Sequence, residues 1–164
     1  MPLFPLRLAG DGRPAGTCFS VPDPLRAAPV SDPDGSDFYA LAYEAAPPLL
    51  RGQHLRPLGA EEVTAGCERL LAAARQRNCA AWLLDGRATP HGQPPALRLW
   101  LREEYWPRVR AALGRPVRAA FLVAPAVRQE LDRQGYPQAE ALPLGVGHVG
   151  WFTGEPAART WLAH

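Results

Sequence analysis

A short polar segment follows an uninterrupted apolar run near the middle of the chain. The run occupies residues 80–84 (AAWLL), and it is followed at every second position by Asp85, Arg87, Thr89 and His91. An arginine can bind an anion, and a carboxylate or an imidazole can move a proton. These four side chains are therefore candidate ligand- or partner-binding residues.

A structural interpretation of the same residues also exists, and we favour it. In this interpretation Asp85 accepts hydrogen bonds from backbone N–H groups of its own turn and pairs with Arg87, while His91 lies in solvent. An enzyme that uses Asp85, Arg87 and His91 requires the three groups within hydrogen-bond reach of one substrate. We rank that possibility third among the functions considered below.

An aromatic segment, WLREEYWP, is the second unusual feature of the chain. Leu97, Leu101 and Tyr105 share one face of a predicted helix, and Trp100 lies well away from that face. Trp100 therefore packs beneath the N-terminal residues, belongs to an exposed apolar patch, or fills the core. Trp100 and Tyr105 join the candidates for ligand or partner binding.

The histidines and cysteines predict no metal site and no disulfide. The histidines lack metal-ligand spacing, and the cysteines are odd in number and without CxxC pairing: Cys18, Cys67 and Cys79. Glycine-rich phosphate-binding motifs, GxSxG and HExxH are also absent from the sequence. We expect a protein without cofactors, and not an enzyme.

Composition indicates a globular protein, and the unpaired cysteines fit the reducing environment of the cytoplasm. Of the 164 residues, 47% are hydrophobic and 21% charged, and all 18 basic residues are arginines. The net charge of +2 falls short of the strong basic patch of a nucleic-acid binder. We find no apolar stretch of membrane-spanning length and no secretory signal pattern, so we expect neither a membrane span nor a nucleic-acid partner.

The chain divides into two predicted regions. Residues 1–37 are rich in proline and glycine and lack periodicity, which predicts an extended arm. Residues 38–164 open with a hairpin and then alternate between strand and helix patterns. The predicted strands are 38–44, 49–55, 80–84, 118–123 and 147–152. This pattern predicts an α/β fold with a mixed sheet of four to five strands and helices packed against it.

Two residues predict local irregularities in these elements. Gly52 weakens the strand at 49–55, which indicates a position near the edge of the sheet. Pro107 lies too deep in a helix predicted over residues 95–113 to be a first-turn proline. We expect it to kink that helix or to split it after Trp106.

Four segments carry a resemblance to a known family. They are the central AAWLLDGR, the helical WLREEYWPRV, the strand AAFLV and the closing WFTGEPAARTWL. Together they resemble the STAS/SpoIIAA-like domain family, in particular bacterial STAS-domain-like proteins of unassigned function. The resemblance covers about residues 38 to 163, and it implies a SpoIIAA-like fold and a regulatory or protein-interaction role.

The resemblance also directs attention to the turn after the central strand. Anti-sigma-factor antagonists of this family are switched by phosphorylation of a serine or threonine in an Asp-Ser-x-Gly-type turn. Asp85 matches the aspartate of that motif, but the turn continues as GRATP, without Ser-x-Gly. Thr89 is the nearby hydroxyl, and it precedes Pro90 in a loop.

The leading functional hypothesis is a non-enzymatic STAS-like module that binds a protein partner or itself, for example as a homodimer. The alternative is a small-molecule or lipid-binding protein. Its pocket would lie between the aromatic second helix and the sheet edge near the Asp85 turn.

Overall fold

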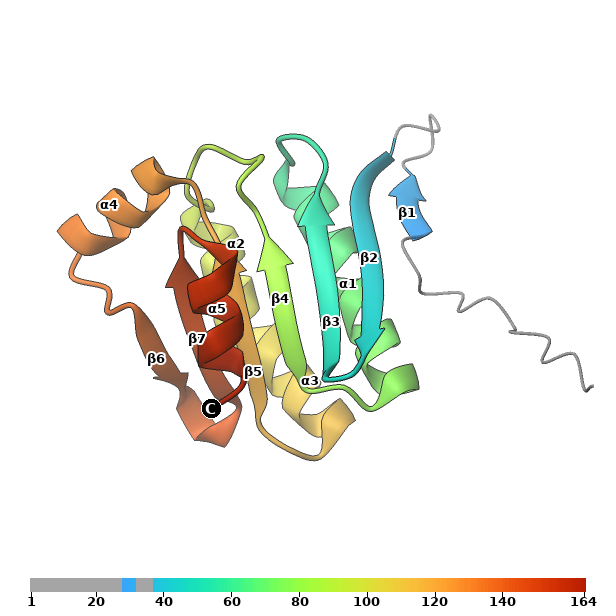
Figure 1. Cartoon of the computed structure of the whole chain (residues 1–164). Coiled ribbons are helices and arrows are strands. Elements are labelled where there is room, and N and C mark those ends of the chain that lie inside the picture. Colours follow the sequence, from blue (N-terminus) through green and yellow to red (C-terminus); the bar gives the residue numbers. More distant parts are fainter. Residues whose placement is uncertain (1–27, 32–36) are drawn as a thin grey trace, which may run out of the picture.

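A seven-stranded mixed sheet with helices on both faces forms the framework of the protein (Figure 1). The computed structural model describes residues 28–31 and 37–164. The strands are β1 (Ala28–Ser31), β2 (Asp37–Ala45), β3 (Pro48–His54), β4 (Ala81–Asp85), β5 (Val117–Leu122), β6 (Ala139–Leu142) and β7 (Gly147–Phe152). Their spatial order is β1-β2-β3-β4-β5-β7-β6. The four strands β3, β4, β5 and β7 run parallel, and the pairings at both edges are antiparallel.

The helices divide between the two faces of the sheet. The helical segments are α1 (Ala60–Arg77), α2 (Pro95–Trp100), the π-helix η1 (Leu101–Tyr105), α3 (Trp106–Leu113), α4 (Pro125–Arg133), the 3₁₀ turn η2 (Pro143–Gly145) and α5 (Glu155–Leu162). In Figure 1, α1, α2 and α3 lie behind the sheet, and α5 crosses its front. The predicted α/β fold class is confirmed at this level.

The prediction of four to five strands was too low. The two strands it missed are the edge strands β1 and β6, each of four residues. Their sequences, APVS and AEAL, are short and carry almost no β-branched or aromatic residues, so they lack the pattern by which strands are recognised. Backbone pairing to a neighbouring strand forms them instead.

Strand β1 falls within the region that the sequence predicts to be an arm. Its residues pair antiparallel with β2. The rest of the predicted arm, residues 1–27 and 32–36, lies outside the described part of the chain.

The core has two layers because β4 is buried on both faces. Trp82 and Leu83 are adjacent and point to opposite sides of the sheet, and both are 0% exposed. Trp82 packs with Tyr105 and Val109 in the larger layer, under the helices behind the sheet. Leu83 belongs to the smaller layer, under α5. Burial of each such side chain contributes about 1.5–3 kcal/mol, so β4 is the element that the rest of the fold encloses.

Strand β3 is not near an edge, contrary to the expectation from Gly52. It lies third in the sheet, between β2 and β4. A Cβ atom at Gly52 would stand 1.9 Å from Tyr39 Oη and 2.8 Å from Tyr39 Cζ. Glycine is present because the buried ring of Tyr39 covers this position, and the residue therefore reports close packing rather than a weak edge.

Pro107 is accommodated by a widened helical turn. The backbone N–H of Trp106 donates to the carbonyl of Leu101, five residues earlier, so a π-type turn precedes the proline. Pro107 then occupies the first turn of α3, where its missing N–H costs little. The boundary falls before Trp106 rather than after it.

The widened turn also accounts for the position of Trp100; most of the N-terminal arm, beneath which the sequence alternatively placed it, lies outside the described residues. The rings of Trp100 and Tyr105 stack at a centroid distance of 5.4 Å and an interplanar angle of 26°. An α-helix would direct residues five apart to different sides, but a turn with one additional residue brings them together. Trp100 is therefore half-buried against the larger core layer.

Gly147 is the residue at which we expect the sheet to be least tolerant of a side chain. Its φ is 150°, and a Cβ atom would lie 1.9 Å from the Val117 carbonyl oxygen and 2.7 Å from the Val117 nitrogen. These are backbone atoms of β5, so relief requires separating β5 from β7. Gly147→Ala should lower the free energy of unfolding, measured in urea, by about 3 kcal/mol.

The matched control for this substitution is Gly92→Ala, because a Cβ atom there meets nothing within 4 Å. It should change the free energy of unfolding by less than about 0.5 kcal/mol. Equal stability of the two variants would contradict the structure at the start of β7.

Candidate functional site

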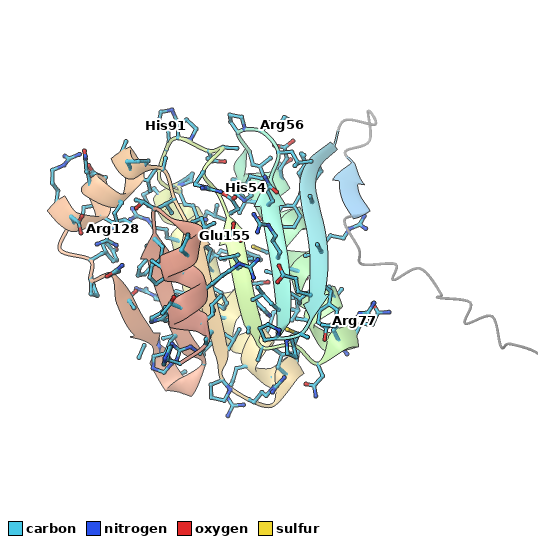
Figure 2. The ribbon with its side chains drawn as sticks, viewed as in Figure 1. His54, Arg56, Arg77, His91, Arg128 and Glu155 are labelled. Atoms are coloured by element: carbon cyan, nitrogen blue, oxygen red, sulfur yellow. The ribbon has the colours of Figure 1, made fainter. Side chains whose placement is uncertain are left out.

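The carboxyl ends of β3 and β4 lie side by side because the two strands are parallel neighbours. Their register places Gln53 opposite Asp85. His54 and the turn at residues 85–89 therefore meet at one end of the sheet, where ligands of open α/β sheets usually bind. Figure 2 shows His54 and Glu155 toward this end of the sheet, with His91 on the loop beyond it.

Asp85 and Arg87 form a two-pronged ion pair. Arg87 Nε donates to Asp85 Oδ1 at 2.9 Å, and Arg87 Nη2 donates to Oδ2 at 2.6 Å. The backbone N–H of Arg87 also donates to Oδ1, at 3.2 Å. Asp85 is 4% exposed, whereas Arg87 reaches the surface. The pair closes the turn, as in the structural interpretation of this segment.

The ionised form of Asp85 is favoured despite its burial. Burial by itself raises the pKa of the carboxyl group, but the hydrogen bonds from the Arg87 side chain and backbone outweigh that effect. The charge of Arg51 acts in the same direction. The pKa of Asp85 therefore lies below its ordinary value, which makes this carboxylate a weak proton acceptor at neutral pH.

The ion pair extends into a charged network across the face of the sheet that α5 covers. Arg51 of β3 has Nη2 at 3.8 Å from Asp85 Oδ2 and Nη1 at 2.7 Å from Glu155 Oε1. Arg159 donates to Glu155 at 2.8 Å and to both carboxylate oxygens of Glu44 at 2.7 and 2.8 Å. In order of contact, the charged network is Arg87, Asp85, Arg51, Glu155, Arg159 and Glu44.

Charges of opposite sign alternate along this charged network, so it is neutral as a whole. Hydrogen bonds from Arg51 and Arg159 hold the pKa of Glu155 below its ordinary value, and the bond from Arg159 does the same for Glu44. The pairing raises the pKa of Arg159 above its ordinary value. The six groups bind one another in sequence, and they link β2, β3, β4 and α5.

Thr89 bridges the turn to the segment before α1. Its Oγ1 lies 2.9 Å from His54 Nδ1 and accepts a 3.4 Å hydrogen bond from the backbone N–H of Leu58. Burial lowers the pKa of His54, although the charge of Asp85 opposes that shift. Neutral His54 with its proton on Nε2 can accept the Thr89 hydroxyl proton, so both bonds of Thr89 are satisfied at once.

The remaining sequence-derived candidates lie apart from this cluster. His91 is exposed on the loop that leads to α2. Tyr105 is 1% exposed, and its hydroxyl donates to the Cys67 carbonyl at 2.8 Å. Trp100 covers the Tyr105 ring. Asp85, Arg87 and Thr89 are thus brought together, while Tyr105 has no surface to offer a partner.

Sequence reasoning missed several members of the cluster, namely Glu44, Arg51, His54, Glu155 and Arg159. The error followed from placing β3 near an edge. A prediction that placed β3 beside β4 as a parallel neighbour would have put His54, at the end of β3, next to Asp85. A second signal was available in α5, because a glutamate four residues before an arginine is a typical helical ion pair.

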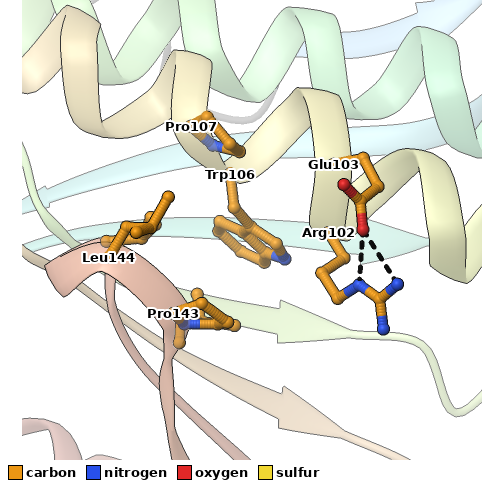
Figure 3. Close-up of a pocket in the computed structure, with 8 residues that line it drawn as sticks. Arg102, Glu103, Trp106, Pro107, Pro143 and Leu144 are labelled. Atoms are coloured by element: carbon orange, nitrogen blue, oxygen red, sulfur yellow. Dashed lines mark hydrogen bonds and ion pairs between the residues drawn. The ribbon is translucent and has the colours of Figure 1, made fainter.

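A small recess borders the aromatic helical segment, on the side of the sheet where β6 and β7 connect (Figure 3). Its volume is about 160 Å³. Its walls are formed by residues of η1 and α3 and by the connection from β6 to β7: Arg102, Glu103, Trp106, Pro107, Leu142, Pro143, Leu144 and Val146. Asp85 is not among the residues that line this recess, so it is not the pocket that the sequence predicts between the aromatic helix and the Asp85 turn.

For metal ligands, membrane helices and cysteines, the structure bears only on the described residues. Within residues 28–31 and 37–164, no three potential ligands among His, Cys, Asp and Glu gather as they would around a metal ion. No helix of this part combines the length and apolar character needed to cross a membrane. Cys67 and Cys79 are free thiols, and Cys18 lies outside the described residues.

Comparisons with protein-family models, with curated proteins and with solved structures find no match to this chain. The resemblance to the STAS/SpoIIAA-like family stays a prediction from the sequence.

The Asp85 ion pair makes stability depend on acid. A carboxyl group whose pKa is lowered by folding stabilises the protein above its unfolded pKa of about 3.9, and this contribution is lost as pH falls through the lower folded value. Asp85→Asn should reduce the free energy of unfolding by about 2 kcal/mol at pH 7. This value lies between the cost of breaking an exposed ion pair and that of breaking a buried one, because Asp85 is buried and Arg87 is exposed. Urea unfolding between pH 7 and pH 2 should show the difference from wild type shrinking below pH 4.

Glu103→Gln is the matched control, since Glu103 pairs with Arg102 at the surface. It should alter the free energy of unfolding by less than about 0.5 kcal/mol at pH 7. A pH-independent difference between wild type and Asp85→Asn would show that the ion pair does not determine the ionisation of Asp85.

Proposed function

We propose that this chain is a non-enzymatic, cytoplasmic STAS-like regulatory module that acts by binding a protein partner or a second copy of itself. The observation that carries the proposal is an apolar surface around one exposed leucine. It consists of Leu144, Pro143 and Pro107 with the buried ring of Trp106 as its floor, and we name it the Leu144 surface.

Leu144 is unusual in both exposure and backbone conformation. Its side chain is 92% exposed, and its φ and ψ of 58° and 25° are in the left-handed region. That conformation costs a residue with a Cβ about 1–2 kcal/mol. Leucine at this position is unfavourable for folding both because its side chain is exposed and because its backbone is strained. A residue with these costs is expected where its side chain contacts another molecule.

The surroundings of Leu144 resemble the centre of a protein interface. Trp106 is 5% exposed and forms the floor of the recess beside it, while Pro107 and Pro143 form rigid walls (Figure 3). Arg102 and Glu103 pair at the rim. An apolar anchor beside an aromatic recess with a charged rim is typical of interfaces between proteins.

The outer edge of β6 continues the same surface. Leu142 ends β6 and also lines the recess. In the described sheet β6 pairs with β7 alone, and its other edge is open. A partner that engages Leu144 can therefore also form backbone hydrogen bonds along β6, which is a common mode of peptide and subunit recognition.

The charged network supports a binding role rather than chemistry at the Asp85 turn. The carboxylates of this network have lowered pKa values, and each is held by at least one arginine. A small-molecule or lipid-binding function ranks second. The recess beside the aromatic helical segment measures about 160 Å³, less than the roughly 300–1,000 Å³ of most ligand pockets.

Leu144→Gly separates binding from folding. Glycine adopts the left-handed conformation without strain, so this variant should equal or exceed the wild type in free energy of unfolding by up to about 1 kcal/mol. Removal of the exposed anchor should weaken association about tenfold or more. Sedimentation velocity over a concentration series measures self-association, and affinity capture with both proteins as baits measures partner retention.

Leu99→Ala is the control, because Leu99 is another exposed leucine, 53% accessible, outside the recess. It should leave association unchanged. A wild-type protein that stays monomeric, and that retains no partner which Leu144→Gly loses, would overturn the proposal.

A further inference from the structure

A second and larger recess lies at the amino ends of β4 and β5, opposite the Asp85 turn. Its volume is about 390 Å³ and it opens to solvent. Three arginines line it, Arg77, Arg115 and Arg118, and Tyr43, Pro48 and Pro116 supply apolar walls. No aspartate or glutamate is among its described lining residues. Figure 2 shows Arg77 at the end of the sheet remote from His54. We name this feature the arginine recess.

The topology of the sheet brings these arginines together. α1 ends at Arg77 and is followed by Asn78 in the left-handed conformation, and the chain then enters β4. α3 ends before Gly114, also left-handed, and the chain passes Arg115 into β5. Because β4 and β5 are parallel neighbours with Ala81 opposite Arg118, both helix ends and their arginines converge.

Arg115 and Arg118 have no carboxylate partner among the described residues. Arg115 donates to the Asn78 carbonyl. Arg118 donates to the Trp161 carbonyl at 2.7 Å, and its guanidinium lies 4.3 Å from the centre of the Trp161 ring. Arg118 Nε is buried without a hydrogen-bond acceptor. The arginines of the charged network, in contrast, are each paired with carboxylates.

The electrostatic balance of the arginine recess favours an anion. The guanidinium groups of Arg115 and Arg118 contribute a charge of +2, and two helix C-termini oppose it with about −0.5 each, which leaves roughly +1. Arginine stays protonated at all relevant pH values, and its planar fork matches the oxygens of a phosphate group. Concave walls of low dielectric concentrate this potential within the recess.

We propose that the arginine recess binds a small phosphate-bearing molecule. The phosphate group is held by Arg115 and Arg118, and the remainder of the ligand lies against Tyr43, Pro48 and Pro116. The volume of about 390 Å³ falls within the usual size of ligand pockets, roughly 300–1,000 Å³. A single recess on a chain of net charge +2 suits a small ligand better than a nucleic-acid backbone, which requires an extended basic surface. This site is separate from the Leu144 surface, and neither proposal depends on the other.

Titration of the full chain with inorganic pyrophosphate tests this site, by isothermal calorimetry at constant ionic strength. We expect saturable binding at one site per chain. Arg115→Gln and Arg118→Gln should each reduce the affinity about tenfold or more, because each removes a charge-assisted hydrogen bond to the phosphate group. Arg115 is exposed, so its substitution keeps the test valid even if loss of the Arg118 contact with Trp161 impairs folding.

Arg98→Gln is the charge-matched control, because Arg98 is exposed on α2 and is not part of the arginine recess. It should retain wild-type affinity within about twofold, as expected when only general screening changes. Absence of saturable binding, or equal affinities of Arg98→Gln and Arg115→Gln, would overturn the proposal. Tighter binding of a short single-stranded oligonucleotide than of pyrophosphate would also overturn it, in favour of a nucleic-acid ligand.

Discussion

The burial of β4 on both faces is the constraint on which the rest of the structure depends. Trp82 and Leu83 are completely inaccessible and face opposite layers. A strand of this kind needs parallel neighbours on both sides and helices above and below, and β3, β5, α5 and the helices behind the sheet meet that need. The alignment of strand ends that creates both polar regions is a consequence of this arrangement.

The two ends of the parallel strands use the same residue type in opposite ways. At the carboxyl ends, Arg51, Arg87 and Arg159 alternate with acidic residues, and the charges cancel within the protein. At the amino ends, Arg115 and Arg118 bond to carbonyl oxygens, which leaves their formal charges without acidic counterparts among the described residues. The same residue type thus cancels its charge at one end of the sheet and carries it without an acidic partner at the other.

Much of the framework was predictable from the sequence, whereas most of the candidate site was not. The unbroken apolar run at residues 80–84 identifies a strand buried on both faces. The carboxylate–arginine pair at the turn also follows from local spacing. Contacts that join distant segments leave no such pattern: Arg51 meets Glu155 across 104 positions of sequence. Gly52 led to a wrong placement of β3, because glycine is found both at weak strand edges and where a side chain covers the backbone closely, and the sequence does not distinguish the two cases.

The π-turn at residues 101–105 has a consequence beyond its tolerance of Pro107. One surplus residue amounts to a rotation of about 100° stored in the middle of a continuous helix. The stack of Trp100 on Tyr105 holds this rotation on one side, and the stack of Trp106 on Trp82 holds it on the other. Arg102 and Glu103 lie within the turn, so their direction is fixed by helical phase rather than by the length of a loop. A shift of the π-turn by one helical turn would point Arg102 and Glu103 in a different direction. Because both side chains line the recess, its entrance would change shape without any change in the sheet.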